Sequence, residues 1–306
     1  MKKAIYIILL ILFLLAVLVL VPSGRIAFGE ITPIPLDEKH GPAPQEDGFS
    51  GDMDYEDPSL SVHIESGRYL DTDYKIAYVK ISDPSQLRTE LAENYSSDET
   101  KAPDRMAQKV NAVLAVNGDF FSTDKPEKFM CRQGRIYHVA CYSRYDVLVI
   151  DKNGDFHIYL QPHWTWKKEN VLEKSALGYE PMQGFAFGPA FVVDGIKLDQ
   201  KTYTTQNCGP DKKTQRSAIC QTGPLEYLCI CCEGPEDPGS KGLTIYEFAD
   251  LVCSFEGVNQ AYNLDGGAST TMVFHGKKIN SPNNPKQRRI SDIIYFCSAY
   301  TSDGED

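Results

Sequence analysis

The stretch from Tyr262 to Thr271 holds the residues best suited to chemistry, in the order Tyr-Asn-Leu-Asp-Gly-Gly-Ala-Ser-Thr-Thr. Apolar runs flank it on both sides, which predicts a strand, a tight break at the two glycines and a second extended run. Glycine permits positive φ and a close approach of the backbone to a ligand. We therefore expect the Asp265 carboxylate at a strand end, beside a concavity.

The chemistry expected of this turn is the binding of an anionic oxygen. The amides of Gly266, Gly267 and Ala268 would line the concavity, and backbone amides arranged in this way suit anions. Ser269 and Thr270 add hydroxyl donors. The competing interpretation is a polar β-turn in which Asp265 caps its own backbone, as Asp-Gly pairs commonly do.

Length and charge restrict the possible functions. The 306 residues allow one large domain or two small ones. A formal net charge of −11 argues against a nucleic-acid partner and against an anionic lipid surface. A local arginine cluster can still bind a phosphate-bearing ligand.

The first residues predict a membrane segment. Lys2 and Lys3 precede an unbroken apolar run over residues 4–21, which Pro22 ends. This length is close to the roughly 20 residues of a membrane-spanning helix, and the leading lysines favour a cytoplasmic N-terminus. We expect residues 1–22 to be a signal anchor, with the rest of a single-pass protein outside the cell. A cleaved signal peptide, and hence a secreted protein, is the alternative, although no A-x-A-like site follows.

Composition divides the remainder into two parts. Residues 23–58 are rich in Pro, Gly, Asp and Glu and nearly free of apolar clusters, which predicts a flexible extracellular stalk. Residues 59–306 are expected to form the folded domain.

Nine cysteines fit an exported protein in which some disulfides form. The run Cys229-Ile230-Cys231-Cys232 lacks a second C-x-x-C at zinc-ribbon spacing, so we expect buried core cysteines and not a metal site. A bridge between Cys208 and Cys220 is plausible. The sequence implies no cofactor, and it leaves open whether a divalent metal takes part.

Many strand patterns and two helix patterns predict one mixed α/β (α+β) domain with a single mixed sheet and flanking helices. The helices are expected from about Pro103 to Val110 and from the capping box at Thr244 to about Phe255. The run from Ala112 to Val116 is apolar on both faces, which places it centrally in the sheet. Asn-Gly at positions 153–154 predicts a hairpin turn.

Five pieces of sequence, in order, resemble the phosphodiester glycosidase family. They are Asn117-Gly118-Asp119-Phe120-Phe121, Gly188-Pro189-Ala190, Gln215-Arg216-Ser217-Ala218, Leu264-Asp265-Gly266-Gly267-Ala268-Ser269-Thr270, and Arg289 before the last strand. Any one piece is weak, but the five keep the order of the family's motifs, and the resemblance as a whole covers roughly residues 60–298.

The resemblance implies a hydrolase that cleaves a sugar 1-phosphodiester at the anomeric C–O bond. Phosphate is a weakly basic leaving group, so a cationic clamp can replace much of the general-acid catalysis. Arg216, with Ser217 beside it, and Arg289 are the candidates for that clamp. Asp265 is the first candidate and Asp119 the second for the carboxylate that stabilises the oxocarbenium-like state.

Asn117 has two interpretations, as a ligand of a sugar hydroxyl or as a cap of the turn that follows its strand. The expected substrates are phosphate-linked cell-wall or capsular glycans, or sugars of host glycoconjugates. The alternative function is a non-catalytic glycan-binding protein of the same fold that helps to assemble exopolysaccharide at the cell surface.

Overall fold

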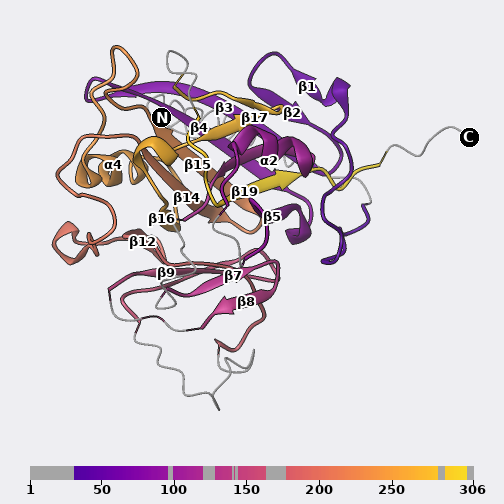
Figure 1. The fold of residues 1–306 in the computed structure, drawn as a ribbon, viewed down its shortest axis with the longest axis horizontal. Coiled ribbons are helices and arrows are strands. Elements are labelled where there is room, and N and C mark those ends of the chain that lie inside the picture. The colour runs from indigo at the N-terminus through magenta and orange to yellow at the C-terminus, as the bar shows by residue number, and fades with distance from the viewer. Residues whose placement is uncertain are drawn as a thin grey trace, which may run out of the picture.

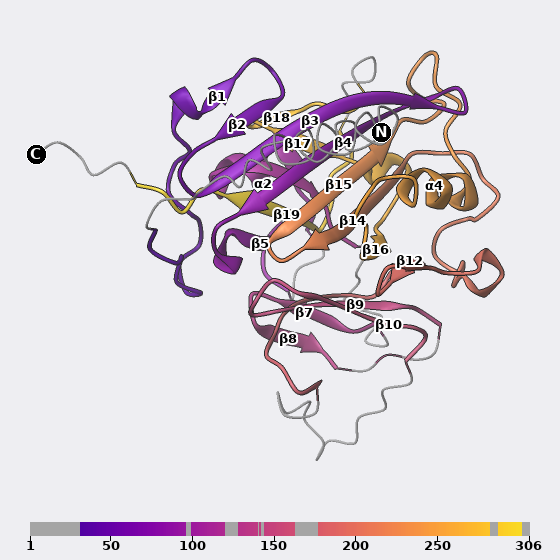
Figure 2. The same ribbon diagram turned by 180° about the vertical axis from the view of Figure 1, so that it is seen from behind.

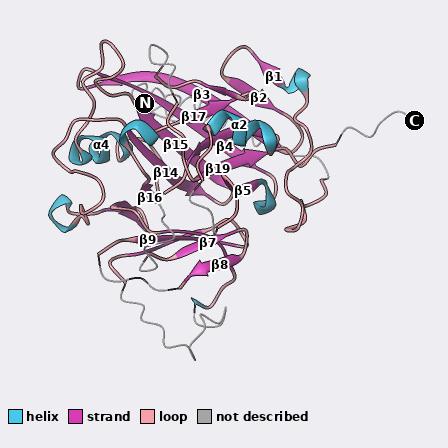
Figure 3. Cartoon of the chain, in the orientation of Figure 1, coloured by secondary structure: helices cyan, strands magenta, loops and turns pink. Residues whose placement is uncertain are grey.

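The computed structural model describes residues 31–95, 99–119, 128–139, 141, 144–162, 177–281 and 287–301. Strands dominate the described chain (Figure 3). Its α-helices are α2 (Pro103–Lys109) and α4 (Ile245–Val252), and its 3-10 turns are η1 (Glu46–Gly48), η2 (Pro84–Gln86), η3 (Gln200–Thr202) and η4 (Gly267–Ser269).

The strands form three sheets. The largest has the order β1 (Phe49–Ser50), β2 (Asp54–Glu56), β3 (Leu60–Tyr69), β4 (Thr72–Ile81), β15 (Glu226–Cys232), β14 (Arg216–Gly223), β16 (Gln260–Asn263), β12 (Ala190–Val193) and β13 (Ile196–Lys197). The second has the order β10 (Phe156–Tyr159), β9 (Val147–Asp151), β11 (Pro181–Phe185), β7 (Met130–Arg132) and β8 (Arg135–His138). The third has the order β18 (Lys277–Lys278), β17 (Met272–Phe274), β6 (Ala112–Asn117), β19 (Asp292–Cys297) and β5 (Leu87–Leu91).

The mixed α+β class is confirmed, but the single mixed sheet is wrong. The strand pairs are antiparallel in all three sheets, as in the long β3–β4 hairpin that crosses the molecule in Figure 2. The second sheet lies apart from the other two, at the bottom of Figure 1. Sheet membership could not be predicted because strand pairing joins segments far apart in sequence.

One apolar core joins the three sheets. Val62, Leu148 and Ile294, one from each sheet, belong to the same buried cluster. The outer face of the largest sheet packs against α4 through residues such as Phe248, and the outer face of the third packs against α2 through residues such as Met106. Successive side chains of a strand point to opposite faces of its sheet. Alternate residues of β15 and of β19 therefore belong to the shared core and to the cluster under the nearby helix.

The local predictions are largely confirmed. Helix α2 lies where it was expected, and α4 begins at the capping box formed by Thr244 and Glu247, although it ends at Val252, before the expected Phe255. Strand β6 is buried along its length and central in its sheet, and β9 and β10 form the hairpin at Asn153-Gly154.

The prediction of a flexible stalk is wrong for residues 31–58. Strands β1 and β2 extend the largest sheet, and Tyr55 is only 1% exposed. Ile34 is buried and its backbone N–H donates to Ser85 Oγ at 2.9 Å. This segment is held in place by single buried apolar residues and by pairing at the edge of the sheet. Neither feature produces a cluster of apolar residues in the sequence, so composition alone could not predict it.

Cys229, Cys231 and Cys232 are core residues, as expected, but all nine cysteines are free, so the expected disulfides, including the bridge between Cys208 and Cys220, are not formed. Both thiols are free, and Cys220 is completely buried on β14. Cys229 and Cys231 face one core cluster and Cys232 faces another, so these three side chains do not converge on one point.

The predicted membrane segment, residues 1–22, lies outside the described residues. Among the residues that are described, the structure contains no helix long and apolar enough to cross a membrane.

Candidate active site

The turn between β16 and β17 has the positive φ and the close backbone approach that the Gly-Gly pair predicts. Gly267 has φ +58°, and a Cβ added at Gly266 would lie 2.9 Å from the carbonyl oxygen of Gln215. The N–H of Gly267 donates to that same oxygen at 2.8 Å, and Leu264 N–H donates to Ser217 O at 2.8 Å. The turn is therefore fastened to the start of β14, and side chains larger than hydrogen would separate the two segments.

Asn117, at the end of β6, connects three pieces of the site. Its Nδ2 donates to the backbone carbonyl of Asp265 at 2.8 Å and to that of Gly118 at 3.0 Å, and its Oδ1 accepts from Thr271 N–H at 3.1 Å. Of its two interpretations, the structure shows the one in which the amide caps backbone groups. We therefore describe Asn117 as a positioning residue.

Behind the turn lies a buried ion cluster, Asp119–Arg132–Asp292. Arg132 Nη2 lies 2.5 Å from Asp119 Oδ1 and 2.7 Å from Asp292 Oδ2, and all three side chains are at most 2% exposed. Ala186 N–H also donates to Asp119 Oδ2 at 2.9 Å. Two carboxylates thus share one guanidinium, which leaves the cluster one negative charge in excess when both are ionised.

Position 118 must be a glycine, because the carboxylate of Asp292 lies where a side chain would begin. A Cβ there would lie 2.3 Å from Asp292 Oδ1, well inside contact distance. Burial raises the pKa of Asp292 more than the charge of Arg132 lowers it, and the nearby carboxylates of Asp119 and Asp265 raise that pKa further.

Asp265 is partly buried and points into the site. Burial raises the pKa of its carboxyl, and three features partly oppose the shift: hydrogen bonds from the Ser269 hydroxyl and from the Gly266 N–H, and the positive charge of Arg288. The Gly266 N–H donates at 2.9 Å to Asp265 Oδ1. The turn therefore holds its own carboxylate, as the competing interpretation proposed, and also presents it to a cavity.

That cavity has a volume of about 50 Å³, which is room for a few water molecules or one small oxyanion. It is lined by Thr100, Asn117, Gly118, Asp119, Asp265, Ser269, Arg288, Arg289, Ile290, Ser291 and Asp292. Residues from three of the five predicted pieces, Asn117-Gly118-Asp119, the Asp265 turn and Arg289, therefore meet at one place. Phe120 and Phe121, from the first piece, lie outside the described residues.

Arg216 lies beside the turn, but it does not line the Asp265 cavity. Its guanidinium is buried and donates to four backbone carbonyls: Cys208 O at 2.5 Å, Lys212 O at 2.7 Å, Gly209 O at 3.0 Å and Leu243 O at 3.1 Å. Ser217 is fully buried and does not line the cavity. The geometry makes Arg216 an anchor of the 208–212 loop, with four of its five N–H groups bonded to backbone carbonyls.

The remaining predicted residues are divided between two sides of the turn. Ser269 lines the Asp265 cavity, whereas Gly267 and Thr270 line a separate hollow on the other side. Arg289 reaches the Asp265 cavity and donates from Nε to Thr100 O at 2.8 Å.

Arg288, Arg132 and Asp292 lie at the site but were not predicted from the sequence as site residues. Arg288 is exposed, lines both the Asp265 cavity and the second hollow, and has no hydrogen-bonding or ionic partner within the described chain. A basic pair before the last strand was the only available signal for it. Asp292 stands at the start of an apolar strand, which is an unusual place for a carboxylate.

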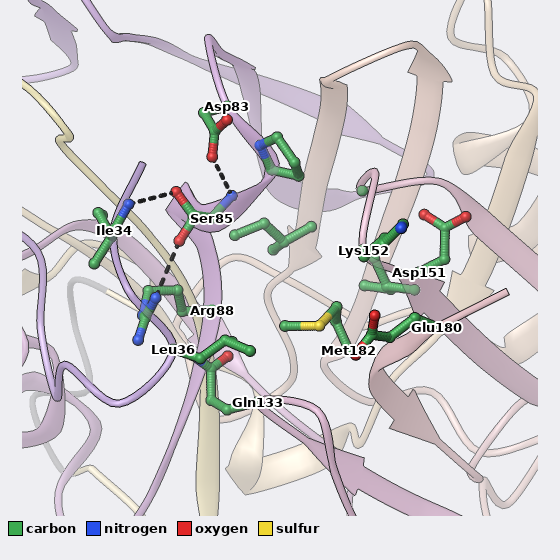
Figure 4. Close-up of a pocket in the computed structure, with 14 residues that line it drawn as sticks. Ile34, Leu36, Asp83, Ser85, Arg88, Gln133, Asp151, Lys152, Glu180 and Met182 are labelled. Carbon is green, nitrogen blue, oxygen red and sulfur yellow. Dashed lines mark hydrogen bonds between the residues drawn. The ribbon is translucent and has the colours of Figure 1, made fainter. Parts of the chain in front are cut away.

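A larger cavity lies away from the Asp265 site. It encloses about 220 Å³ between the N-terminal segment near Leu36 and the second sheet near Met182 (Figure 4). It shares no lining residue with the Asp265 cavity.

Comparison with known proteins agrees with this geometry. The family model for phosphodiester glycosidase matches residues 110–297. The SPbeta prophage-derived uncharacterized protein YomE of Bacillus subtilis (strain 168) is 25% identical over 205 residues, which is 66% of this chain and 30% of that protein. The chain thus spans less than a third of the length of this relative.

Two solved structures share the fold. The catalytic domain of zebrafish N-acetylglucosamine-1-phosphodiester alpha-N-acetylglucosaminidase, auto-inhibited by its pro-peptide, matches with a TM-score of 0.61 and 16% identity over 79% of this chain and 84% of that chain. A putative exported protein from Burkholderia pseudomallei matches with a TM-score of 0.51 and 14% identity over 74% of each chain.

The family model covers more than half of the sequence and spans the turn, the Asp119–Arg132–Asp292 cluster and the final strand. The chain therefore belongs to the phosphodiester glycosidase family, which points to the hydrolysis of glycosyl phosphodiesters at the level of the family.

Proposed function

We propose that this protein hydrolyses a sugar 1-phosphodiester at the anomeric C–O bond, with Asp265 as the carboxylate that acts on the sugar. One observation carries the proposal: Asp265 shares its cavity with Arg288, a guanidinium without another partner in the described chain. A carboxylate beside an available cation suits a substrate with an anionic leaving group attached to an electrophilic carbon.

The residues divide the work by charge. Arg288 binds the non-bridging phosphate oxygens, with Arg289 next to it, and stabilises the charge that develops as phosphate departs. Asp265 stabilises the positive charge on the anomeric carbon, as nucleophile or as base for water. The C1–O bond breaks, its electron pair leaves with the phosphate monoester, and a water oxygen forms the new bond to C1.

Substitution of Asp265 tests the proposal. Asp265→Asn should lower kcat/KM for sugar 1-phosphodiesters by about 10²–10⁴-fold, the usual range for loss of an acid–base group. Asp194→Asn is a matched control, because Asp194 also precedes a glycine in a turn and lies outside the cavity. Equal activity of wild type and Asp265→Asn would refute the assignment.

Labelled water identifies the bond that breaks. Hydrolysis in ¹⁸O-water should place the label on C1 of the released sugar and leave the phosphate monoester unlabelled. Label in the phosphate would show attack on phosphorus instead. Tight binding without turnover by the wild type would favour the alternative, a non-catalytic glycan-binding protein.

We also propose that residues 1–22 anchor the enzyme in the cell membrane with the folded part outside. The support is the apolar run over residues 4–21 behind two lysines. The full-length chain should stay in the membrane fraction after an alkaline wash. A mature chain that begins between residues 23 and 30, recovered from the medium, would replace the anchor with a cleaved signal.

A further inference from the structure

The larger cavity, near the edge strand β5, has the size and the lining of a site for a small organic ligand. An apolar cavity of about 150 Å³ already accommodates benzene, and this cavity has a volume of about 220 Å³. Leu36 of the N-terminal segment, Leu87 of β5, and Ile150 and Met182 of the second sheet supply its apolar wall (Figure 4). A mostly apolar wall with a few polar groups is typical of small-molecule sites.

Arg88 places a buried positive charge in this wall. It is only 2% exposed, and in the described part of the chain it forms no ion pair with a carboxylate. Its guanidinium donates to three backbone carbonyls, Glu38 O at 2.7 Å, Ser85 O at 3.3 Å and Pro35 O at 3.4 Å, whereas its Nε makes no hydrogen bond there. The neighbouring Tyr295 hydroxyl stays neutral, because burial raises its pKa and the charge of Arg88 only partly opposes this shift. Buried charges in proteins are nearly always paired, so an anion in the cavity would suit this arginine.

The carboxylates of the cavity do not supply that anion. Asp151 and Glu180 lie across the hollow from Arg88 in Figure 4. Asp151 Oδ1 accepts from two backbone N–H groups of its own turn, at 2.8 and 3.0 Å, and Asp83 Oδ1 accepts from one in the η2 turn at 2.9 Å. The other cation of the lining, Lys152, is exposed. Arg88 is therefore the buried cation of the cavity, on the opposite side from Asp151 and Glu180.

We propose that this cavity binds a small apolar carboxylate, with the carboxylate group at Arg88 and the apolar body between Leu36 and Met182. The carboxylate would supply both a counterion and an acceptor for the Nε–H, and charge-assisted hydrogen bonds from arginine to carboxylates are among the strongest in proteins. The apolar body would cover Leu36, which is 52% exposed. The cavity shares no lining residue with the Asp265 cavity, so this inference does not depend on the proposed function.

Calorimetry with the full chain and a set of matched ligands tests the site. Phenylacetate carries its carboxylate on an apolar ring, phenylacetamide is a neutral counterpart of the same size, and acetate lacks the ring. The measured quantity is the ratio of the phenylacetamide Kd to the phenylacetate Kd. We expect a ratio of about ten, because an ionised acceptor bonds a guanidinium more strongly than a neutral one. Acetate should bind about tenfold more weakly than phenylacetate or worse, because it buries no ring.

Two substitutions locate the carboxylate group of the ligand. Arg88→Met removes the buried charge and should bring the ratio to about one. Lys152→Met is the matched control, because it removes the exposed cation from the same cavity, and it should change the ratio by less than about twofold. If Lys152→Met abolishes the preference for phenylacetate and Arg88→Met does not, the assignment to Arg88 is wrong.

A third substitution keeps the test decisive if Arg88→Met does not fold. Leu36→Glu changes a half-exposed residue and places a competing carboxylate at the cavity, so it should also reduce the ratio toward one. Leu160→Glu is its control, because Leu160 is 49% exposed and lies outside the cavity. The site is overturned by the absence of saturable phenylacetate binding to the wild type, by a wild-type ratio of one, or by equal effects of Leu36→Glu and Leu160→Glu. Diester hydrolysis assays decide the proposed function separately.

Discussion

The side chain of Asn117 holds the backbone carbonyl of Asp265 at 2.8 Å, although 148 residues separate them in the sequence. This bond fixes the start of the Gly266–Thr270 turn to the end of the central strand β6. Asn117 thus sets the position of the carboxylate without contacting the substrate through its own oxygen, which is bonded to Thr271 N–H.

Removal of this link should affect both stability and catalysis. Asn117→Ala loses three hydrogen bonds, which corresponds to about 3 kcal/mol of unfolding free energy at about 1 kcal/mol each. A displaced Asp265 should also lower kcat/KM by about 10–100-fold. Urea titration and a diester assay measure the two effects. Asn207→Ala, which loses one bond of 3.3 Å, should change neither by a comparable amount.

The acidic limb of the pH–rate profile should report the environment of Asp265. Because burial raises its pKa, activity that needs the ionised carboxylate should fall, as pH decreases, at a higher pH than for an ordinary aspartate. Arg288 opposes this shift, so Arg288→Gln should raise the pKa of Asp265 further and move the limb to higher pH. If Arg288→Gln leaves the acidic limb of the pH–rate profile unchanged, Arg288 does not influence the pKa of Asp265. Arg289→Gln is the comparison.

The buried cluster Asp119–Arg132–Asp292 predicts a large stability effect. Arg132→Met leaves two buried carboxylates without their counterion and should destabilise the fold by about 3–5 kcal/mol. Arg68→Met is the matched control, because the pair of Arg68 with Asp73 is about half exposed and should contribute about 0–1 kcal/mol. Equal urea midpoints for the two variants would contradict this assignment.

Arg216 should behave as a structural residue. Arg216→Met deprives four backbone carbonyls of their donor and should lower stability by about 3 kcal/mol or more, since hydrogen bonds to charged groups contribute about 1.5–3 kcal/mol each. Thermal unfolding with and without a bound diester measures the effect. Unchanged stability together with a large loss of diester affinity would return Arg216 to the role of phosphate clamp.

The features that could be predicted from the sequence are those set by residues close to one another in the chain. The capping box of Thr244, the hairpin at Asn153-Gly154 and the buried run of β6 are local signals, and each is found where it was expected. The Gly266-Gly267 turn was also predicted, because glycine suits both the close approach at Gly266 and the positive φ at Gly267.

What escaped prediction depends on contacts between distant segments. The direction of the Arg216 side chain is decided by the carbonyls of the 208–212 loop, which no pattern in its own strand indicates. Arg132 is the counterion of Asp119 and Asp292. These two carboxylates lie at the ends of two other strands, β6 and β19, so the sequence around Arg132 does not indicate the cluster. Likewise, β2 is ordered by pairing with β3, and Ile34 by its hydrogen bond to Ser85, and both partners lie outside residues 31–58.

Strand β19 lies between β6 and β5, although both of those strands precede residue 118 and β19 ends at Cys297. During translation β5 and β6 therefore emerge first and wait for the strand that must separate them. At 5–20 residues per second this wait lasts roughly 10–35 s, during which both strands expose unpaired edges. Because Asp292 begins this late strand, the Asp119–Arg132–Asp292 cluster can form only after residue 292 has been synthesised.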